Sequence, residues 1–337
     1  MIHQSFIQLS DIFKKYLQND TSTPYYDNIQ KSIHQAEVLN PWFIRPFVHT
    51  MLSHISHLIS KESIENYIAD FKTASHPKNI LVVAAGNIPM VSFHDVMTVL
   101  LSGHTLILKP SSKDTILMKM ILQLLQDIRP NLKNKIFIVE NTISTKNIDA
   151  VIATGTNNTA LYFHQYFAQY PRIVRNNRTS IAIIDETTTD EDLKKLADDI
   201  LLYFGMGCRN VSKIFIPKNF DIQRIFKSIY NYRFVMQHHK YMNNYDYYRS
   251  IYLLNKENFL ENNFLIVKES EQLHAPVANL FYQTYTDINE PLKYIQNHQN
   301  EIQTIVGKNY TPFGMSQFPN ISDFSDGINT KNFLMEI

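Results

Sequence analysis

The stretch that decides the fold is NILVVAAGNIPMVSFHDVMTVLLSGHTLILKPSS, residues 79–112. A short apolar run over 79–86 is followed by a turn at Gly86–Pro89, a helical pattern over 91–103 and a second apolar run over 104–111. Apolar runs that alternate with amphipathic stretches at short spacing predict strand–helix–strand units and a parallel sheet. The sequence therefore predicts an α/β fold around this segment.

The same alternation continues along the rest of the chain. Residues 1–75 show helical spacing of apolar side chains, interrupted by prolines. Further predicted elements are a helix at 113–129, strands at 135–140 and 150–155, a helix at 157–170, strands at 180–185 and 212–217 with a helix at 190–204 between them, and strands at 264–269, 277–285 and 302–308. We therefore expect two three-layer α/β domains with parallel sheets.

The composition narrows the class of protein. The chain has 337 residues, 44% hydrophobic and 19% charged, which is the balance of a globular protein. A formal net charge of +1 predicts no nucleic-acid or membrane partner, and polar residues interrupt the most apolar segment, so we expect no membrane span. One cysteine excludes an internal disulfide and favours a reducing, cytoplasmic location. The totals leave homo-oligomerisation open.

The single cysteine, Cys208, lies in the segment GMGCRNVS between a predicted helix and a predicted strand. The whole chain has only 8 glycines, and Gly205 and Gly207 are two of them. Glycines beside the thiol allow a sharp turn and the close approach of a substrate, and Arg209 favours the thiolate. The alternative is that Cys208 is a small buried apolar side chain, as lone cysteines usually are.

A nucleotide cofactor is indicated where the second strand ends. In dinucleotide-binding units an acid about 20 residues beyond the glycine turn binds the ribose 2′-hydroxyl. Counted from Gly86, this region holds Lys109, Ser111 and Ser112 instead. A cation and two hydroxyls suit a 2′-phosphate, so we expect NADPH. The G-x-G-x-x-G fingerprint is absent, which argues against an ordinary Rossmann dehydrogenase.

Other polar residues follow predicted strands. Asn87 is either an amide donor to a developing oxyanion or a turn residue before a proline. His94 and Asp95 form an acid–base pair or the polar face of a helix. The two histidines at 238–239 have no metal-ligand spacing, so we expect no metal site.

Several motifs together resemble one family. The stretches AAGNIPMVSFHDVMTVLLSGHTLILKPSSKD, ATGTNNTALYF, VRNNRTSIAIID and FGMGCRNVSKIFIP, and the C-terminal IQTIVGKNYTPFGMSQFPNISDFSDGINTKNFL, are similar to the acyl-CoA reductases of the aldehyde dehydrogenase superfamily. The similarity is closest to the long-chain reductases of bacterial bioluminescence. It covers roughly 79–337 of the chain, with the motifs in the same order and at similar spacing.

The resemblance implies roles for individual residues. Cys208 matches the acylated nucleophile, and Asn87 matches the oxyanion amide of the Asn-x-Pro motif. Lys109 matches the lysine that binds the adenosine ribose. Ser112 stands where NAD-preferring members carry glutamate, which again favours NADPH.

The resemblance also implies an aldehyde dehydrogenase-like architecture, with a variant Rossmann cofactor domain and a catalytic domain. Thr154, Gly155 and Thr156 match the Thr-Gly-Ser that lies along the cofactor, although Thr156 is equally a helix N-cap. The implied domains are an N-terminal helical segment (1–75) packed on an NADP-binding domain (76–178), a catalytic cysteine domain (179–310) and a C-terminal tail (311–337).

One departure from the superfamily bears on the chemistry. Members that oxidise aldehydes carry a Glu-Leu-Gly-Gly motif whose glutamate activates water, whereas this chain has Val174, Arg175 and Asn176 there. Without a base, water attacks an acyl-enzyme poorly. We therefore expect an NADPH-dependent reductase that converts an acyl-CoA, most simply a fatty acyl-CoA, or an acyl-carrier thioester into an aldehyde. The alternatives are the reverse, CoA-acylating aldehyde oxidation, a cofactor-free acyltransferase or thioesterase, and a silent scaffold.

Overall fold

The structure is a computed structural model that describes residues 2–71, 73–140 and 147–337. The chain divides into two compact units. Unit 1 combines residues 1–177 with 320–337, and unit 2 comprises residues 178–319. Both ends of the chain therefore belong to unit 1.

Unit 1 is built on a parallel sheet, which in the described ranges has five strands in the order β3-β2-β1-β4-β5. The strands are β1 (Asn79–Val83), β2 (Thr105–Lys109), β3 (Ile136–Ile138), β4 (Ala150–Thr154) and β5 (Arg172–Arg175). Leu81 of β1 and Val151 of β4 pack together with Phe167 in the core of this unit. The strand order reverses between β1 and β4, so this is the topological switch point of the sheet.

The carboxyl ends of the strands in unit 1 lie level with one another. Val83 of β1 pairs with Lys109 of β2 on one side and with Ala153 of β4 on the other. Ala153 pairs in turn with Val174 of β5. The residues that follow these strands therefore meet at one edge of the sheet, which is where ligands of doubly wound sheets bind.

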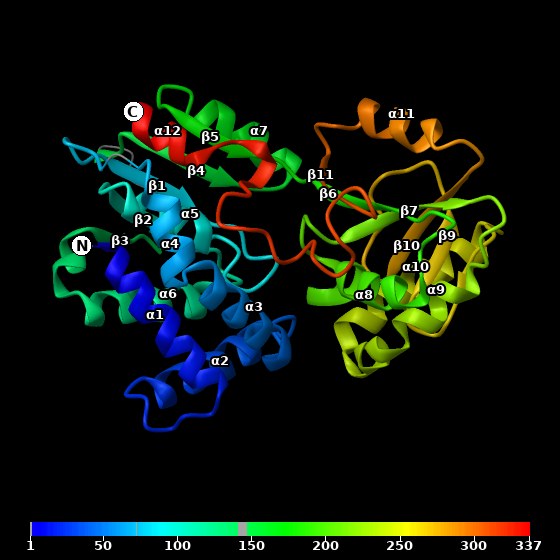
Figure 1. Ribbon diagram of the computed structural model, residues 1–337, viewed down its shortest axis with the longest axis horizontal. Coiled ribbons are helices and arrows are strands. Elements are labelled where there is room, and N and C mark those ends of the chain that lie inside the picture. Colours follow the sequence, from blue (N-terminus) through cyan, green and yellow to red (C-terminus); the bar gives the residue numbers. More distant parts are fainter. Residues whose placement is uncertain (1, 72, 141–146) are drawn as a thin grey trace. The chain divides into compact units, whose positions relative to one another are not determined.

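Helices cover both faces of this sheet. Helix α5 contacts β1 and β2, and α7 contacts β4 and β5. Right-handed crossovers that leave the switch point in opposite directions place α5 and α6 on one face and α7 on the other. The N-terminal helices add an outer layer, in which α1 contacts α5 and α6 and α2 contacts α6 (Figure 1). The helices of unit 1 are α1 (Ile2–Leu17), α2 (Tyr26–Leu39), α3 (Arg45–Leu58), α4 (Lys61–Ile68), α5 (Phe93–Leu101), α6 (Thr115–Ile128), α7 (Asn157–Tyr166) and α12 (Thr330–Glu336).

Unit 2 is built on a second sheet, whose described strands number six in the order β11-β6-β7-β10-β9-β8. Its pairs are parallel except β8 with β9. The strands are β6 (Thr179–Ile183), β7 (Val211–Pro217), β8 (Leu260–Glu261), β9 (Ile266–Glu269), β10 (Asn279–Tyr285) and β11 (Ile302–Val306).

Two helical layers enclose the second sheet. Figure 1 shows α11 on the face opposite to α8, α9 and α10. Ile181 and Phe215 of the sheet pack with Tyr294 of α11 in the core of this unit. Helix α8 begins with a capping box, in which Thr189 and Asp192 bond each other's backbone N–H groups. The helices of unit 2 are α8 (Asp190–Leu201), α9 (Gln223–Ser228), α10 (His239–Leu254) and α11 (Asn289–Asn297).

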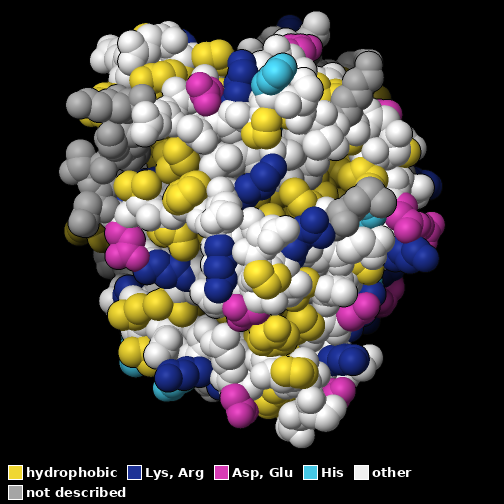
Figure 2. Space-filling view, turned by 90° about the vertical axis from the view of Figure 1, so that its left-hand side faces the viewer, with side chains coloured by type: hydrophobic (Ala, Val, Ile, Leu, Met, Phe, Trp, Pro, Cys, Tyr) yellow, Lys and Arg dark blue, Asp and Glu magenta, His cyan; other side chains and the backbone are white. Residues whose placement is uncertain are grey.

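The predicted fold class, α/β with parallel sheets, is confirmed. On the face drawn in Figure 2, basic and acidic side chains are interspersed among apolar ones, in keeping with the small net charge of the chain. Within the described residues, no helix is long and apolar enough to cross a membrane.

Candidate active site

The turn after β1 carries Asn87, whose side chain is exposed. Gly86 precedes it, and a Cβ at that position would clash with the Oγ of Ser111, so only glycine fits. Met90, three residues after Asn87, has a left-handed backbone (φ 52°). Its N–H donates to the Asp114 carboxylate at 2.6 Å. Burial raises the pKa of Asp114. The turn that presents Asn87 is therefore fixed by Ser111 and Asp114, from the segment between β2 and α6.

The predicted ribose-binding residues lie at the carboxyl end of β2, where Lys109 is the last residue of the strand. The Lys109 ammonium donates to the backbone oxygen of Glu140 at 2.5 Å. Ser111 is half-buried against Gly86, whereas Ser112 is exposed. These three residues stand one strand away from the turn that carries Asn87, because β2 is the neighbour of β1.

Glu140, which follows β3, is an acid that the sequence did not point to. Its carboxylate forms an ion pair with Lys119 of α6, and this pairing lowers the pKa of Glu140, with a smaller contribution from Lys109. The end of β2 thus carries two lysines and one carboxylate that is already paired. Nothing in the sequence indicated Glu140, because it is far along the chain from the turn after β1. It comes close to Lys109 only because β3 pairs with β2.

Thr154, Gly155 and Thr156 lie at the carboxyl end of β4, on the other side of the switch point. Thr154 and Gly155 are half-buried, and the Gly155 N–H donates to the Arg175 carbonyl at 3.3 Å. Thr156 is the N-cap of α7, and its hydroxyl accepts the Thr159 N–H. The N-cap interpretation of Thr156 is correct, and it places the positive end of α7 beside these residues.

Arg175 is the last residue of β5 and one of the three residues, 174–176, that the sequence sets against the glutamate motif. Its side chain is only 5% exposed and pairs through two nitrogens with the Asp95 carboxylate of α5. It also donates to the Thr330 hydroxyl of α12 at 2.8 Å. Neither Arg175 nor Asp95 is placed to act as a base.

His94, the neighbour of Asp95, has a structural partner as well. One ring nitrogen lies 2.7 Å from the Ile321 carbonyl oxygen, and the ring packs edge-on against Phe324. His94 and Asp95 are therefore not an acid–base pair. His94 holds α5 to the C-terminal segment that returns to unit 1, whereas Asp95 holds α5 to Arg175 of β5.

Cys208 lies in unit 2, three residues before the start of β7, and is half-buried. Between α8 and the thiol, Tyr203 (φ 54°), Phe204 (φ 57°) and Gly205 (φ 73°) all have left-handed backbones. Such a conformation costs about 1–3 kcal/mol for each non-glycine residue and persists only where the surroundings enforce it. The predicted helix at 190–204 ends at Leu201 for this reason, and the strained turn brings the chain sharply to Cys208.

Asn210, two residues beyond the thiol, was not predicted to matter. It is 2% exposed, and its side-chain oxygen accepts the Gly207 N–H at 2.7 Å. Ser180 at the start of β6 donates from its hydroxyl to the Cys208 carbonyl at 3.0 Å. The only signal in the sequence was that a polar residue, Asn210, stands between Cys208 and the apolar run that forms β7.

Two basic side chains near the Cys208 loop, Arg209 and Lys213, form hydrogen bonds with other parts of unit 2. Arg209, expected to favour the thiolate, donates from its guanidinium to the Thr304 hydroxyl at 3.0 Å. Lys213 of β7 is buried, which lowers its pKa to about 8, and its ammonium donates to the carbonyls of Ser270 and Gln272.

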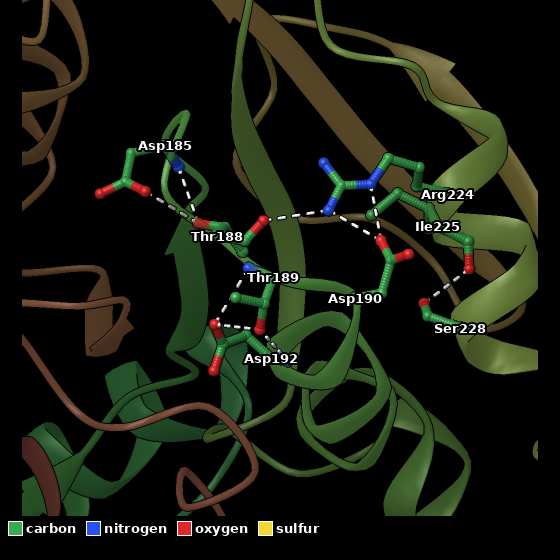
Figure 3. A network of polar contacts seen from close by, with 8 residues as sticks. All are labelled: Asp185, Thr188, Thr189, Asp190, Asp192, Arg224, Ile225 and Ser228. Atoms are coloured by element: carbon green, nitrogen blue, oxygen red, sulfur yellow. Dashed lines mark hydrogen bonds and ion pairs between the residues drawn. The ribbon is translucent and has the colours of Figure 1, made fainter.

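A separate cavity of about 300 Å³ lies at the carboxyl ends of β6 and β11, where Asp185 and Lys308 line it. Figure 3 shows the polar network beside it, including the Arg224 guanidinium on the Asp190 carboxylate. Cys208 precedes β7 whereas Asp185 follows β6, and the two strands are parallel. This cavity therefore lies at the opposite end of the sheet from the thiol.

The described ranges contain no group of three or more His, Cys, Asp or Glu side chains that could hold a metal ion. His238, one of the two neighbouring histidines, is the N-cap of α10 and packs against Phe204 of the strained turn.

Comparisons with known proteins bear on both family and fold. The acyl-CoA reductase (LuxC) family matches residues 15–227, a segment that includes every residue of the candidate site. No curated protein matches the sequence.

Solved structures, aldehyde dehydrogenases among them, match the fold. The aldehyde dehydrogenase of Mycobacterium tuberculosis, complexed with NAD+, has a TM-score of 0.63 at 13% identity, covering 89% of this chain and 72% of that one. KauB of Pseudomonas aeruginosa has a TM-score of 0.67 at 10% identity, with 99% and 83% covered. HpcC of Thermus thermophilus also reaches 0.67, at 11% identity, with 90% and 68% covered. The family match spans more than half of the chain, so the protein belongs to the acyl-CoA reductase (LuxC) family and has an aldehyde dehydrogenase-like fold.

Proposed function

We propose that this protein reduces an acyl-CoA, and most simply a fatty acyl-CoA, to an aldehyde through an acyl-enzyme on Cys208, with NADPH as the hydride source. The observation that carries the proposal is the Cys208 loop. The only cysteine of the chain follows three consecutive left-handed residues, within the segment that matches the acyl-CoA reductase family. Strain of this kind is typical of functional turns.

Unit 1 has the features that a dinucleotide requires. The switch point between β1 and β4 opens at the carboxyl edge of the sheet, and α7 begins there with its positive dipole end. The aldehyde dehydrogenase of M. tuberculosis and an indole-3-acetaldehyde dehydrogenase were solved with NAD+, which supports a nicotinamide cofactor for this fold. Residues 76–178 are accordingly proposed as the NADP-binding domain and 179–310 as the catalytic domain, with helices 1–75 packed on the former and 311–337 as a tail.

NADPH is proposed over NADH because of the charges at the end of β2. Lys109 is a cation, and Ser111 and Ser112 offer hydroxyls. Of the described carboxylates near them, Glu140 is paired with Lys119, and Asp114 is buried, which raises its pKa. The cation and the hydroxyls attract a 2′-phosphate.

The proposed reaction has two covalent steps. The Cys208 thiolate attacks the thioester carbonyl carbon, and the bond to the CoA sulfur breaks, releasing CoA as a thiolate that takes up a proton. A bound reduced nicotinamide supplies the hydride that this acyl-enzyme requires. The resulting oxyanion receives hydrogen bonds from the Asn87 amide and the Cys208 backbone N–H. The oxyanion then re-forms its C=O bond as the bond between carbon and the Cys208 sulfur breaks, which releases the aldehyde and returns Cys208 as the thiolate.

Hydride, rather than water, is proposed to resolve the acyl-enzyme. Arg175 and Asp95 neutralise each other in a buried ion pair, so neither side chain activates water. The chain departs here from enzymes that form acids, and an aldehyde is the product expected. The acyl donor is CoA or an acyl-carrier protein, and a cytoplasmic location without a nucleic-acid partner is part of the same proposal.

The direct test follows NADPH absorbance in the presence of acetyl-CoA, octanoyl-CoA and hexadecanoyl-CoA. We expect NADPH oxidation with at least one of them, one aldehyde formed per NADPH, and no oxidation with Cys208→Ala. Unchanged turnover in that variant would refute the proposed mechanism. Release of free acid without NADPH would identify a thioesterase, and turnover only from aldehyde, CoA and NADP+ would identify the reverse reaction.

A further inference from the structure

The peptide groups around Cys208 are held by two side chains. Asn210 holds both sides of Gly207: its Oδ1 accepts the Gly207 N–H at 2.7 Å, and its own backbone N–H donates to the Gly207 carbonyl at 3.0 Å. Ser180 holds the next carbonyl, that of Cys208. Three consecutive peptide groups, those that join residues 206 to 209, are therefore fixed in orientation.

This arrangement determines where the Cys208 N–H points. A trans peptide is planar, and its C=O and N–H point in opposite directions. The Gly207 carbonyl points into the turn, towards the Asn210 N–H, so the Cys208 N–H of the same peptide points out of the turn. It is thereby presented on the outer side of the turn, as an oxyanion donor must be.

Asn210 is itself held rigidly. Its amide nitrogen donates to the carbonyls of Asp199 (3.0 Å), Ile200 (3.4 Å) and Leu202 (2.9 Å) at the end of α8. These are carbonyls that a helix end leaves without helical partners. The Asn210 backbone oxygen also accepts the Ser180 N–H at 3.1 Å. One buried side chain therefore connects the end of α8, the start of β6 and the loop of the nucleophile.

We infer that Asn210, supported by Ser180, is the positioning residue that aims the Cys208 backbone N–H at the substrate carbonyl oxygen. This inference rests on the proposed function, because it requires an oxyanion to form at Cys208. Asn210 touches no reacting atom and acts through the peptide between Gly207 and Cys208.

Two reactions of the same thiol separate this role from a structural one. Acylation by an acyl-CoA generates an oxyanion, whereas alkylation by iodoacetamide displaces iodide and generates none at the attacked carbon. Both depend equally on the thiolate. In Asn210→Ala, we expect the rate of Cys208 acylation to fall by ~10²-fold, the typical effect of losing one oxyanion donor. The alkylation rate and its pH profile should stay within a few-fold of the parent's.

The matched control is Asn279→Ala. Asn279 is also a buried asparagine of unit 2, and its amide donates to the Val277 carbonyl, outside the Cys208 loop. This variant should lose thermal stability and keep both rates. Ser180→Ala, a milder change, should lower acylation by ~10-fold with alkylation unchanged, and it carries the test if Asn210→Ala does not fold.

Both rates are read by intact-protein mass spectrometry, with the acyl-CoA that modifies the parent fastest. Equal losses of acylation and alkylation, or acylation at the parent's rate in the folded variants, would overturn the role of Asn210 while leaving the proposed function intact. A parent protein that no acyl-CoA modifies would instead overturn the proposed function.

Discussion

The lifetime of the acyl-enzyme without cofactor follows from the buried pair of Arg175 and Asp95. Residues 174–179 contain no carboxylate, and the Arg175 side chain is 5% exposed with Asp95 as its partner. A positioned general base contributes about 10²–10⁴-fold, and a typical enzyme turns over at about 10 s⁻¹. Hydrolysis without that base should therefore proceed at ~10⁻¹ to ~10⁻³ s⁻¹, which corresponds to an acyl-enzyme lifetime of roughly 10 to 1,000 s.

The assay mixes the protein with an acyl-CoA in the absence of NADPH and quantifies released CoA by chromatography. We expect a burst close to one CoA per Cys208, followed by release at the slow hydrolytic rate. Addition of NADPH should restart CoA release and yield aldehyde. Steady release of free acid at about 1 s⁻¹ or faster without NADPH would refute the reasoning, because it would require a base that the Arg175 region does not supply. Asn176→Glu, a change at an exposed position, is expected to introduce slow hydrolysis.

Four further predictions concern single side chains. Asn87→Ala should lower turnover by ~10²-fold with NADPH affinity unchanged; normal turnover in a destabilised variant would favour a turn role. NADPH should raise the melting temperature more than NADH at equal concentration, and Ser112→Glu should reverse that order; equal shifts in the parent would contradict the NADPH assignment. Asp95→Ala should lower the free energy of unfolding by about 3–5 kcal/mol in urea titrations, because it leaves Arg175 buried without its partner, whereas Asp95→Leu combined with Arg175→Met should cost far less. Burial raises the pKa of Asp199 from 3.8 to about 6, so the folded protein binds this proton more tightly than the unfolded chain does. The free energy of unfolding should therefore fall by about 3 kcal/mol as the pH rises from about 3.8 to about 6, and Asp199→Asn should abolish this dependence.

Local patterns predicted much of the fold because most strands are short apolar runs bounded by turns. The predicted strand at 104–111 corresponds to β2, and the predicted helix at 113–129 corresponds to α6. Strand β5 (Arg172–Arg175) was missed, since two of its four residues are arginines. Arg175 is buried only because Asp95 and Thr330, 80 and 155 residues away, supply its partners. No local pattern carries that information.

Part of the candidate site could also be predicted from local sequence patterns. Residues at the carboxyl ends of strands, such as Lys109 and Thr154, could be found by counting, and β-sheet register brings them to one edge. Glu140 and Asn210 could not, because their importance depends on contacts with other elements. The left-handed turn at Tyr203 and Phe204 was equally hidden, since neither residue favours that conformation and the surrounding fold imposes it.

The central claim is that Cys208 carries the acyl group that hydride then reduces. The most direct measurement is a mass-spectrometric chase: the protein is loaded with an acyl-CoA, freed of excess reagent, mapped for its adduct, and then mixed with NADPH. The account predicts an acyl group on Cys208 that disappears within seconds of NADPH addition, with one aldehyde formed per adduct lost. An adduct on another residue, or one on Cys208 that NADPH leaves unchanged or converts to free acid, would contradict it.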